Sequence, residues 1–268
     1  MTLSLFDRPA VLFLPASNPR AIAKARGSAA DLVILDLEDA VKAEDKESAR
    51  AAAVEAVADE WPMPVAIRIN SPHTEWHGHD VVGMMHSKVE LIVVPRAETK
   101  QDLSFVRNQT GRPIAAMIET AKGVLAAQEI AREAAALIAG TNDLAADRRL
   151  PRGAGRAPLQ MALQSIVLAA RAAGIAVFDG VFNSLEDEAG FAVEAAEGRR
   201  MGFDGKSLIH PNQIAACHAA FAPSHEEIAR AERLVSAATG GAERFEGEMI
   251  ERMHVEAAQR LLGRASRA

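Results

Sequence analysis

The sequence has very little cysteine, few aromatic residues and no long apolar run. Cys217 is the single cysteine among 268 residues, so no disulfide can form within the chain, and this composition fits a reducing cytoplasm. No apolar stretch approaches the roughly 20 residues of a membrane-spanning helix. The segment MTLSLFDRPAVLFLPASN lacks the basic region of a secretion signal. Because the net charge is −6, nucleic acid is not expected as the main partner. We therefore expect a cytoplasmic protein that binds neither membranes nor nucleic acid.

Short apolar runs alternate with helix-length segments along most of the chain, and this alternation predicts β/α units. A spacing of about 25 residues per unit predicts a closed (β/α)₈ TIM barrel. A doubly wound open sheet is the competing arrangement, but the sequence has no dinucleotide-binding glycine motif. The expected strands are Ala10–Leu14, Asp31–Leu37, Val65–Asn70, Glu90–Val94, Ile114–Ile118, Ala136–Ala139, Ile175–Phe178 and Asp204–Ile209. The expected helices between them are Pro19–Ser28, Glu44–Trp61, Val81–Ser87, Lys100–Asn108, Lys122–Glu133, Leu159–Ala173 and Ser184–Met201.

The last part of the chain does not continue this pattern. Two further helices are expected at Ser224–Ala238 and Met249–Leu262, on either side of the glycine-rich segment TGGAERFEGE, which should be flexible. We therefore expect residues 1–222 to form the barrel and residues 223–268 to form a C-terminal helical extension. This extension docks on its own barrel or reaches a neighbouring subunit.

Two acidic residues follow neighbouring strands of the predicted barrel. Glu119 comes directly after one strand and Asp143 comes shortly after the next. Because the C-terminal ends of parallel strands share one edge, these carboxylates should lie side by side. Two unpaired carboxylates are costly, and a divalent cation with oxygen ligands would satisfy both. The sequence thus predicts a metal site for Mg²⁺, or alternatively Mn²⁺, on Glu119 and Asp143.

Arg68 lies inside the third expected strand, close to acidic strand ends. Its guanidinium could hold the carboxylate of a 2-oxo acid while the metal polarises the carbonyl oxygen. Alternatively, Arg68 and one acid form a structural ion pair beneath the rim of the barrel. An acidic group follows the second strand, and it either supports the metal site or begins a helix, where acids are favoured. This group consists of Asp36, Glu38 and Asp39.

Other polar groups are weaker candidates. The histidines of SPHTEWHGHD could bind zinc, but a solvated loop is the favoured interpretation because no nearby cysteine or second ligand group closes the site. The basic loop at residues 148–158 could attract phosphate or could simply be solvated. Asp179 follows the seventh strand and would lie at the same mouth. Cys217 lies in a helix without a basic neighbour, so a core or surface position is favoured over a nucleophile.

Seven short motifs occur along the chain in the order typical of one known family: RPAVLFLPASNPRAIAKA, DLVILDLEDAV, AIRIN, MIETAKGV, GTNDLAAD, FDGVFN and GFDGKSLIHPNQI. Through them the chain resembles the citrate lyase beta-subunit-like branch of the HpcH/HpaI aldolase superfamily, which includes malyl-CoA and citramalyl-CoA lyases. The resemblance covers nearly the whole chain. It implies a TIM barrel and reversible, Mg²⁺-dependent cleavage of a 3-hydroxyacyl-CoA to an acyl-CoA and a 2-oxo acid.

The resemblance also implies roles for single residues. Glu119 and Asp143 match the Mg²⁺ ligands of the family, and Arg68 matches the arginine that binds the substrate carboxylate. Arg20 and Lys24 match positions near the coenzyme A moiety. Relatives are commonly homotrimers in which a C-terminal segment reaches the neighbouring active site.

The C-terminal motif differs from the usual form of the family. Relatives often carry G-K-M-I/V-D, whose aspartate acts in acid/base catalysis, whereas this chain has GEMIE at Gly247–Glu251. We expect Glu251 to take the place of that aspartate, because a glutamate can also move a proton. The turn after LFLP also differs, and both differences concern the CoA side of the site. An aldolase acting on free 2-oxo acids, or a catalytically altered metal- and ligand-binding homologue, are therefore the alternatives.

Overall fold

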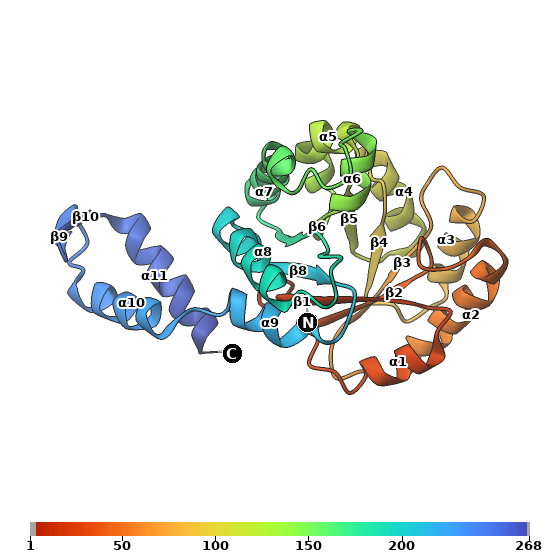
Figure 1. Cartoon of the computed structure of the whole chain (residues 1–268), viewed down its shortest axis with the longest axis horizontal. Coiled ribbons are helices and arrows are strands. Elements are labelled where there is room, and N and C mark those ends of the chain that lie inside the picture. Colours follow the sequence, from red (N-terminus) through yellow and green to blue (C-terminus); the bar gives the residue numbers. More distant parts are fainter. Residues whose placement is uncertain (1–3, 267–268) are drawn as a thin grey trace. The chain divides into compact units, whose positions relative to one another are not determined.

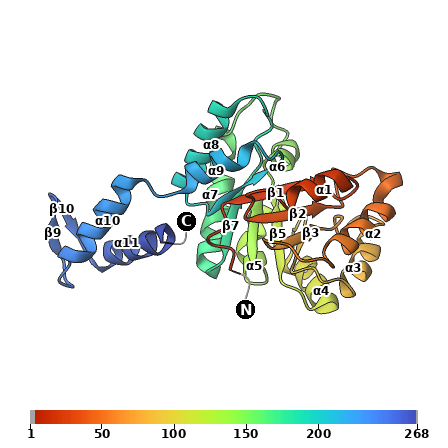
Figure 2. The same ribbon diagram turned by 90° about the horizontal axis from the view of Figure 1, so that it is seen from below.

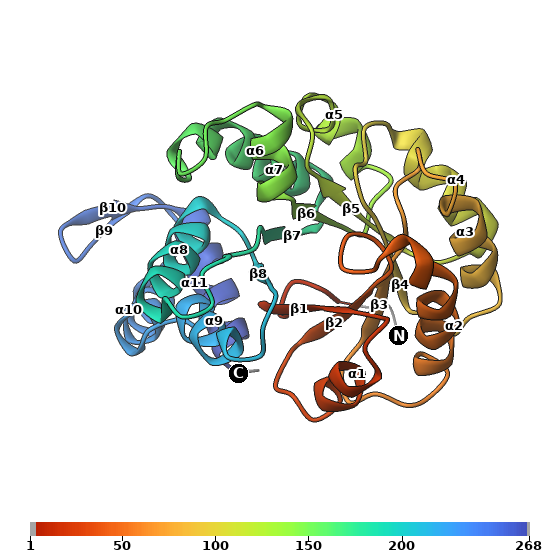
Figure 3. The ribbon, with the colours of Figure 1, turned by 45° about the vertical axis from the view of Figure 1, so that its right-hand side comes forward.

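Eight short strands close into a barrel in which neighbouring strands are parallel and follow one another in chain order, from β1 to β8 (Figures 1 and 3). The computed structural model describes residues 4–266. The predicted (β/α)₈ barrel is confirmed, and the competing prediction of a doubly wound open sheet is wrong. The strands are β1 (Ala10–Pro15), β2 (Leu32–Asp36), β3 (Val65–Arg68), β4 (Leu91–Val94), β5 (Ile114–Ile118), β6 (Ala136–Ala139), β7 (Ala176–Asp179) and β8 (Gly205–Leu208).

Helices surround the barrel, and two 3₁₀ turns, η1 (Ala43–Asp45) and η2 (Ala157–Leu159), precede two of them. Within residues 4–266, no helix is long and apolar enough to cross a membrane. The helices are α1 (Pro19–Ala25), α2 (Lys46–Ala56), α3 (His77–Met85), α4 (Lys100–Thr110), α5 (Ala121–Ala131), α6 (Thr141–Asp147), α7 (Gln160–Ala173), α8 (Glu188–Met201) and α9 (Gln213–Phe221).

The strand pattern places polar residues at one end of the barrel. Ala66 and Met117 belong to the apolar core inside the barrel. Arg68 and Glu119 each lie two residues further along, and alternate residues of a strand face the same side. They therefore continue the inward-facing rows at the C-terminal ends of the strands, where TIM barrels carry their active sites.

Two helices begin at other residues than the sequence indicated. The α3 helix begins at His77, so the polar loop predicted through His79 is shorter than expected. The α8 helix begins after Asp187 and not at Ser184. Asp187 is the better cap because its carboxylate accepts the Gly190 N–H at 2.8 Å. This close contact requires glycine at position 190, since a Cβ there would lie only 2.1 Å from the carboxylate.

The described chain divides into two compact units between Ala220 and Phe221. In the second unit, α10 (His225–Ala237) and α11 (Arg252–Ala265) pack side by side, and the hairpin of β9 (Glu243–Phe245) and β10 (Glu248–Ile250) lies at one end of the pair (Figure 2).

The second unit differs from the sequence-based expectation in its central segment. The flexible segment contains this hairpin, and the last helix begins three residues later than predicted. Both turn residues, Glu246 and Gly247, have positive φ angles, as a two-residue hairpin turn requires.

Candidate active site

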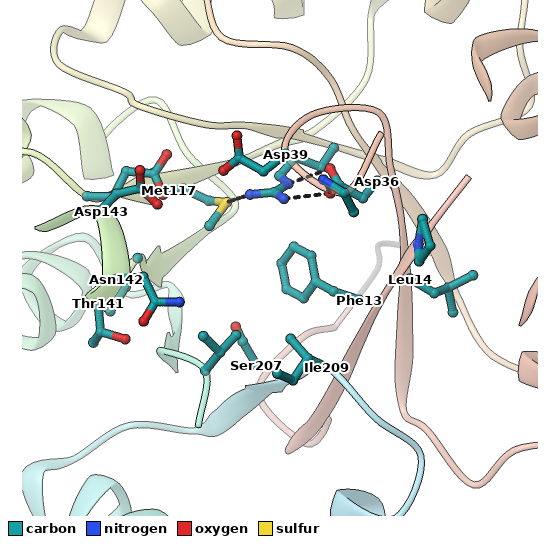
Figure 4. A pocket seen from close by; sticks show the side chains of 17 residues that line it. Phe13, Leu14, Asp36, Asp39, Met117, Thr141, Asn142, Asp143, Ser207 and Ile209 are labelled. Carbon is teal, nitrogen blue, oxygen red and sulfur yellow. Dashed lines mark hydrogen bonds and ion pairs between the residues drawn. The ribbon is translucent and has the colours of Figure 1, made fainter. Parts of the chain in front are cut away.

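A pocket of about 380 Å³ opens at the C-terminal ends of the strands (Figure 4). One part of its wall is charged and carries Asp36, Asp39, Arg68, Glu119 and Asp143. Another part is largely apolar and carries Phe13, Leu14, Met117, Val181 and Ile209. The pocket therefore brings together the predicted metal ligands and the predicted carboxylate-binding arginine.

Glu119 is buried and fixed in orientation by two backbone segments. Its Oε1 accepts the Arg96 N–H at 2.6 Å, and Arg96 adopts a positive φ of 47°, which is uncommon for a residue other than glycine. Position 140 must be glycine, because a Cβ there would lie 2.3 Å from Glu119 Oε2. Burial raises the pKa of Glu119 to about 7, with Arg68 opposing and Asp143 adding to the rise.

Asp143 lies in the first turn of α6, and the sequence did not indicate this helix. Its side chain is 38% exposed, and its Oδ1 lies 3.7 Å from Nη1 of Arg96. Burial raises the pKa of Asp143, and the carboxylate of Asp39 raises it further. Repulsion between acids thus acts on both members of the predicted metal-binding pair.

This pair fits a magnesium ion better than a metal that needs many protein ligands. No group of three or more His, Cys, Asp or Glu side chains in residues 4–266 is arranged to hold a metal ion. Mg²⁺ usually keeps several waters and takes only one or two carboxylates together with substrate oxygens. Burial is the main cause that raises both pKa values, and Glu119 and Asp143 are two such carboxylates on one pocket wall, where a bound cation would favour their charged forms.

Arg68 is held by two acidic side chains. Its Nε and Nη2 donate to the two oxygens of Asp36 at 2.7 and 2.6 Å, and Nη1 lies 3.0 Å from Glu38 Oε2. Burial alone would lower the pKa of Arg68, but Asp36 raises this pKa above its ordinary value, so the side chain stays cationic. The structural ion pair considered from the sequence is therefore present, in a residue that also lines the pocket.

The acidic group after β2 divides between two environments. Burial raises the pKa of Glu38 to about 9, although the charge of Arg68 lowers it. Asp36 is buried, whereas Asp39 is exposed and lines the pocket. Asp36 and Glu38 contact Arg68, and their predicted supporting role for the metal stays a prediction.

A buried lysine that was not expected from the sequence connects these strand ends. Lys46 Nζ donates to the carbonyl oxygens of Leu37 and Glu38 and to Asn70 Oδ1, each at 2.7 Å. Asn70 in turn donates from its backbone and side chain to Asp80 Oδ2 at 2.7 Å. A lysine at the start of a charged helix resembles a surface residue, so no sequence pattern marked this one.

The histidine cluster does not form the zinc site considered from the sequence. His77 is buried, and its Nδ1 lies 2.8 Å from the Asn70 carbonyl oxygen. His73 and His79 are exposed. The favoured interpretation as a solvated loop is wrong for His77, which begins α3 and packs behind the strand ends.

Asp179 was predicted at the mouth, but it faces away from the pocket. It accepts hydrogen bonds from Lys206 Nζ at 3.1 Å and from Arg156 Nη2 at 2.8 Å. Lys206 Nζ also donates to Glu194 Oε1 on α8 at 2.7 Å. Asp179 follows the inward-facing Phe178, so its side chain alternates to the outer face of the barrel. Arg156 of the basic loop is therefore a structural partner of this carboxylate.

Residues 9–211 match the HpcH/HpaI aldolase/citrate lyase family. The chain belongs to this family. It is 39% identical over 268 residues to a (3S)-malyl-CoA thioesterase of Cereibacter sphaeroides, covering 95% of this chain and 93% of that protein. It is 34% identical over 278 residues to citrate lyase subunit beta of Leuconostoc mesenteroides subsp. cremoris, covering 95% and 92%. The chain is an enzyme of the aldolase/citrate lyase class.

A solved structure of the same type is also similar. The protein CitE from Mycobacterium tuberculosis, in complex with magnesium, acetoacetate and coenzyme A, superposes with a TM-score of 0.87 at 33% identity. The match covers 98% of this chain and 100% of that one. The resemblance to the citrate lyase beta-subunit branch is thus confirmed.

Three further residues matched to the family lie outside the pocket lining. Arg20 and Lys24 are exposed on α1, which follows β1. Glu251 belongs to the second unit, where it precedes the first residue of α11 and its backbone N–H donates to His254 Nδ1 at 2.9 Å. Their roles toward CoA and proton transfer stay predictions.

Proposed function

We propose that this family member is a Mg²⁺-dependent carbon–carbon lyase that cleaves a 3-hydroxyacyl-CoA of the citramalyl-, malyl- or citryl-CoA type. The products are an acyl-CoA and a 2-oxo acid. The observation that carries this proposal is the shared pocket of Arg68, Glu119 and Asp143. The magnesium, acetoacetate and coenzyme A bound by the similar CitE protein support it.

Arg68 would bind the carboxylate of the 2-oxo acid part. Asp36 takes Nε and one N–H of Nη2, and this pairing fixes the plane of the guanidinium. Nη1 also lies 3.7 Å from the sulfur of Met117, which is a weak acceptor. A substrate carboxylate would replace this weak contact with a charge-assisted hydrogen bond.

Glu119 and Asp143 would hold the cation, and Mn²⁺ should replace Mg²⁺ in vitro because both metals accept oxygen ligands. Bound there, the metal would polarise the substrate oxygen beside the bond that breaks. Gly140 and the Arg96 N–H keep Glu119 in place for this role.

The hydroxyl proton needs a base, and we assign this role to Glu251 of a second copy of the chain. Its exposed position supports this assignment. As the proton leaves, the hydroxyl oxygen forms the carbonyl of the 2-oxo acid and the carbon–carbon bond breaks. The electron pair passes to the acyl-CoA as an enolate, which then takes a proton. This arrangement requires a homo-oligomer, with a trimer as the expected state.

Product analysis tests the proposed reaction. Purified protein is incubated with citramalyl-, malyl- and citryl-CoA, with Mg²⁺ or with EDTA. We expect stoichiometric acyl-CoA and 2-oxo acid from at least one substrate with Mg²⁺, and none with EDTA. No turnover of any of the three with Mg²⁺ would contradict the proposal.

Exposed Arg20 and Lys24 would bind the CoA phosphates, so replacing both should raise KM for the thioester.

Thioester hydrolysis is a second candidate function. The similarity to a (3S)-malyl-CoA thioesterase is higher, at 39% identity, than the 34% to the citrate lyase subunit. A hydrolase would release free CoA and the intact hydroxy acid, so the same assay separates the two reactions. An aldolase acting on free 2-oxo acids would instead be stabilised thermally by pyruvate and not by CoA thioesters.

A further inference from the structure

Ser207 carries a buried hydroxyl that has no hydrogen-bond partner. It lies on β8 with 2% of its surface exposed, and its Oγ has neither donor nor acceptor within residues 4–266. In that range, only Arg156 Nε shares this condition, and it lies 3.3 Å from the carboxylate of Glu197. Buried polar groups are nearly always hydrogen-bonded, so the Ser207 hydroxyl requires an explanation.

Ser207 lines the pocket across the barrel from Arg68 and Glu119. In a closed ring ordered from β1 to β8, strand β8 lies across from β4. The neighbours of β4 are β3, which ends in Arg68, and β5, which is followed by Glu119. The unpartnered hydroxyl therefore lies across the barrel mouth from Arg68 and Glu119, whereas Asp143 follows β6, two strands from β8.

The close view agrees with this arrangement. Figure 4 shows Ser207 and Ile209 on one side of the pocket and Asp36 and Asp143 on the other, with the ring of Phe13 projecting between them. Phe13 and Ile209 line the pocket near Ser207, and the polar side chains of Thr141 and Asn142 follow toward Asp143. Ser207 is the residue of β8 that lines the pocket, so its hydroxyl is the donor that this strand offers to a ligand oxygen.

We propose that the Ser207 hydroxyl donates a hydrogen bond to the thioester carbonyl oxygen of the bound acyl-CoA. This inference rests on the proposed function, in which Arg68 and the metal hold the 2-oxo acid half of the substrate. The other half then extends toward β8, and its thioester carbonyl is the acceptor that this wall lacks.

The same contact would act in the chemical step. When the carbon–carbon bond breaks, negative charge develops on the thioester oxygen. A hydrogen-bond donor already aimed at that oxygen stabilises the enolate more than the neutral thioester. Loss of the hydroxyl should therefore lower kcat more than it weakens binding.

The experiment compares acetyl-CoA with free CoA, which has no thioester carbonyl, by titration calorimetry with Mg²⁺ present. In Ser207→Ala, acetyl-CoA should bind roughly three- to tenfold more weakly, as expected for one lost neutral hydrogen bond. Free CoA should bind within about twofold of the wild type. The kcat of cleavage should fall by about 10²-fold, as for loss of one oxyanion donor. Ser207→Cys introduces a weaker donor of similar size, so its acetyl-CoA affinity and kcat should lie between those of the wild type and of Ser207→Ala.

Ser87 is the matched control. It is 5% exposed, and its hydroxyl donates to the Met84 carbonyl oxygen at 3.0 Å. Ser87→Ala should lower the Tm and leave acetyl-CoA binding unchanged. Ser207→Ala should leave the Tm unchanged or raise it, because no hydrogen bond of the folded chain is lost.

Three outcomes would overturn the inference. Ser207→Ala could bind acetyl-CoA as tightly as the wild type, or it could lose affinity for acetyl-CoA and free CoA equally. Either result would contradict the proposed hydrogen bond to the thioester carbonyl and would leave the proposed function intact. If the wild type itself binds neither ligand, the CoA part of the proposed function fails together with this inference.

Discussion

Two clusters of charged side chains lie on opposite sides of the barrel wall, and they are balanced differently. The outer cluster, defined by Lys206, Arg156, Asp179, Glu194 and Glu197, sets two cations against three acids through direct ion pairs. The mouth cluster, defined by Arg68, Arg96, Asp36, Glu38, Glu119 and Asp143, sets two arginines against four acids, and Arg96 reaches Asp143 only at 3.7 Å.

This difference separates a structural network from a binding site. In the outer cluster Lys206 is completely buried, and its ammonium group is surrounded by acceptors. In the mouth cluster Arg68 is engaged by Asp36 and Glu38, which leaves Glu119 and Asp143 to repel one another. A cluster in which each acid contacts a cation directly indicates a structural role, whereas a pocket wall on which acids repel one another indicates a site for a cation.

The largest effect on stability should come from the outer cluster. Lys206→Met would remove the buried ammonium that pairs with Asp179 and Glu194 and leave Arg156 as their remaining cation. Breaking a buried ion pair from one side costs about 3–5 kcal/mol. Urea denaturation should therefore show a lower free energy of unfolding by that amount. A variant as stable as the wild type would mean that the outer cluster is not structural.

Glu119→Gln should weaken metal binding and leave the stability of the protein unchanged. We expect Mg²⁺ affinity to fall by about 10²-fold or more, as when a residue of a metal site is removed, and cleavage to be lost. The metal-free protein should keep its stability, because a buried repulsive charge is removed. Glu194→Gln is the matched control in the outer cluster. It should lower stability and leave Mg²⁺ affinity unchanged in calorimetry.

The pH dependence should distinguish the mouth cluster further. The pKa values of Glu119 and Glu38 are raised from 4.5 to about 7 and about 9. The folded state therefore holds protons that the unfolded state releases, so stability of the metal-free protein falls as pH rises through this range. Each group contributes at most about 1.4 kcal/mol per pH unit.

Mg²⁺ affinity should follow the opposite trend, because metal binding needs the carboxylate of Glu119. It should increase as pH rises toward about 7 and then level off. Urea denaturation at several pH values checks the trend in stability, and calorimetric titration with Mg²⁺ at the same pH values checks the trend in affinity. Glu38→Gln should flatten the stability profile above pH 7, and an unchanged slope would show that Glu38 is not the group involved.

The smallest effect should come from Arg96. Arg96→Gly keeps the backbone N–H that Glu119 accepts and removes the cation beside Asp143. We expect Mg²⁺ to bind about two- to fivefold more tightly, in line with the weak coupling of part-exposed ion pairs. Arg149→Gly is the control, since Arg149 also has a positive φ and is exposed. If Arg96→Gly and Arg149→Gly changed Mg²⁺ affinity equally, the effect would come from the net charge of the protein and not from the position of Arg96.

The sequence predicted the barrel because each strand is a short apolar run and the runs recur at regular intervals. It also predicted that Glu119, Asp143 and Arg68 share one mouth, because parallel strand ends meet there. It placed Asp179 at the same mouth, since the order of residues does not show that this carboxylate would alternate to the outer face. Lys46 was not recognised as a partner of the strand ends, and the acid that pairs with Arg68 was left open, because these contacts join residues far apart in the chain.

The close approach of Gly140 to Glu119 links two motifs that are separated in the sequence. Position 140 has room for a hydrogen atom only, because a Cβ there would lie 2.3 Å from Oε2 and 2.4 Å from Cβ of Glu119. A relative with a larger residue at position 140 would have to move the backbone that carries position 119, since no change of rotamer moves a Cβ atom. The identity of one residue in GTND would then indicate, without a structure, whether MIET can hold its carboxylate in this position.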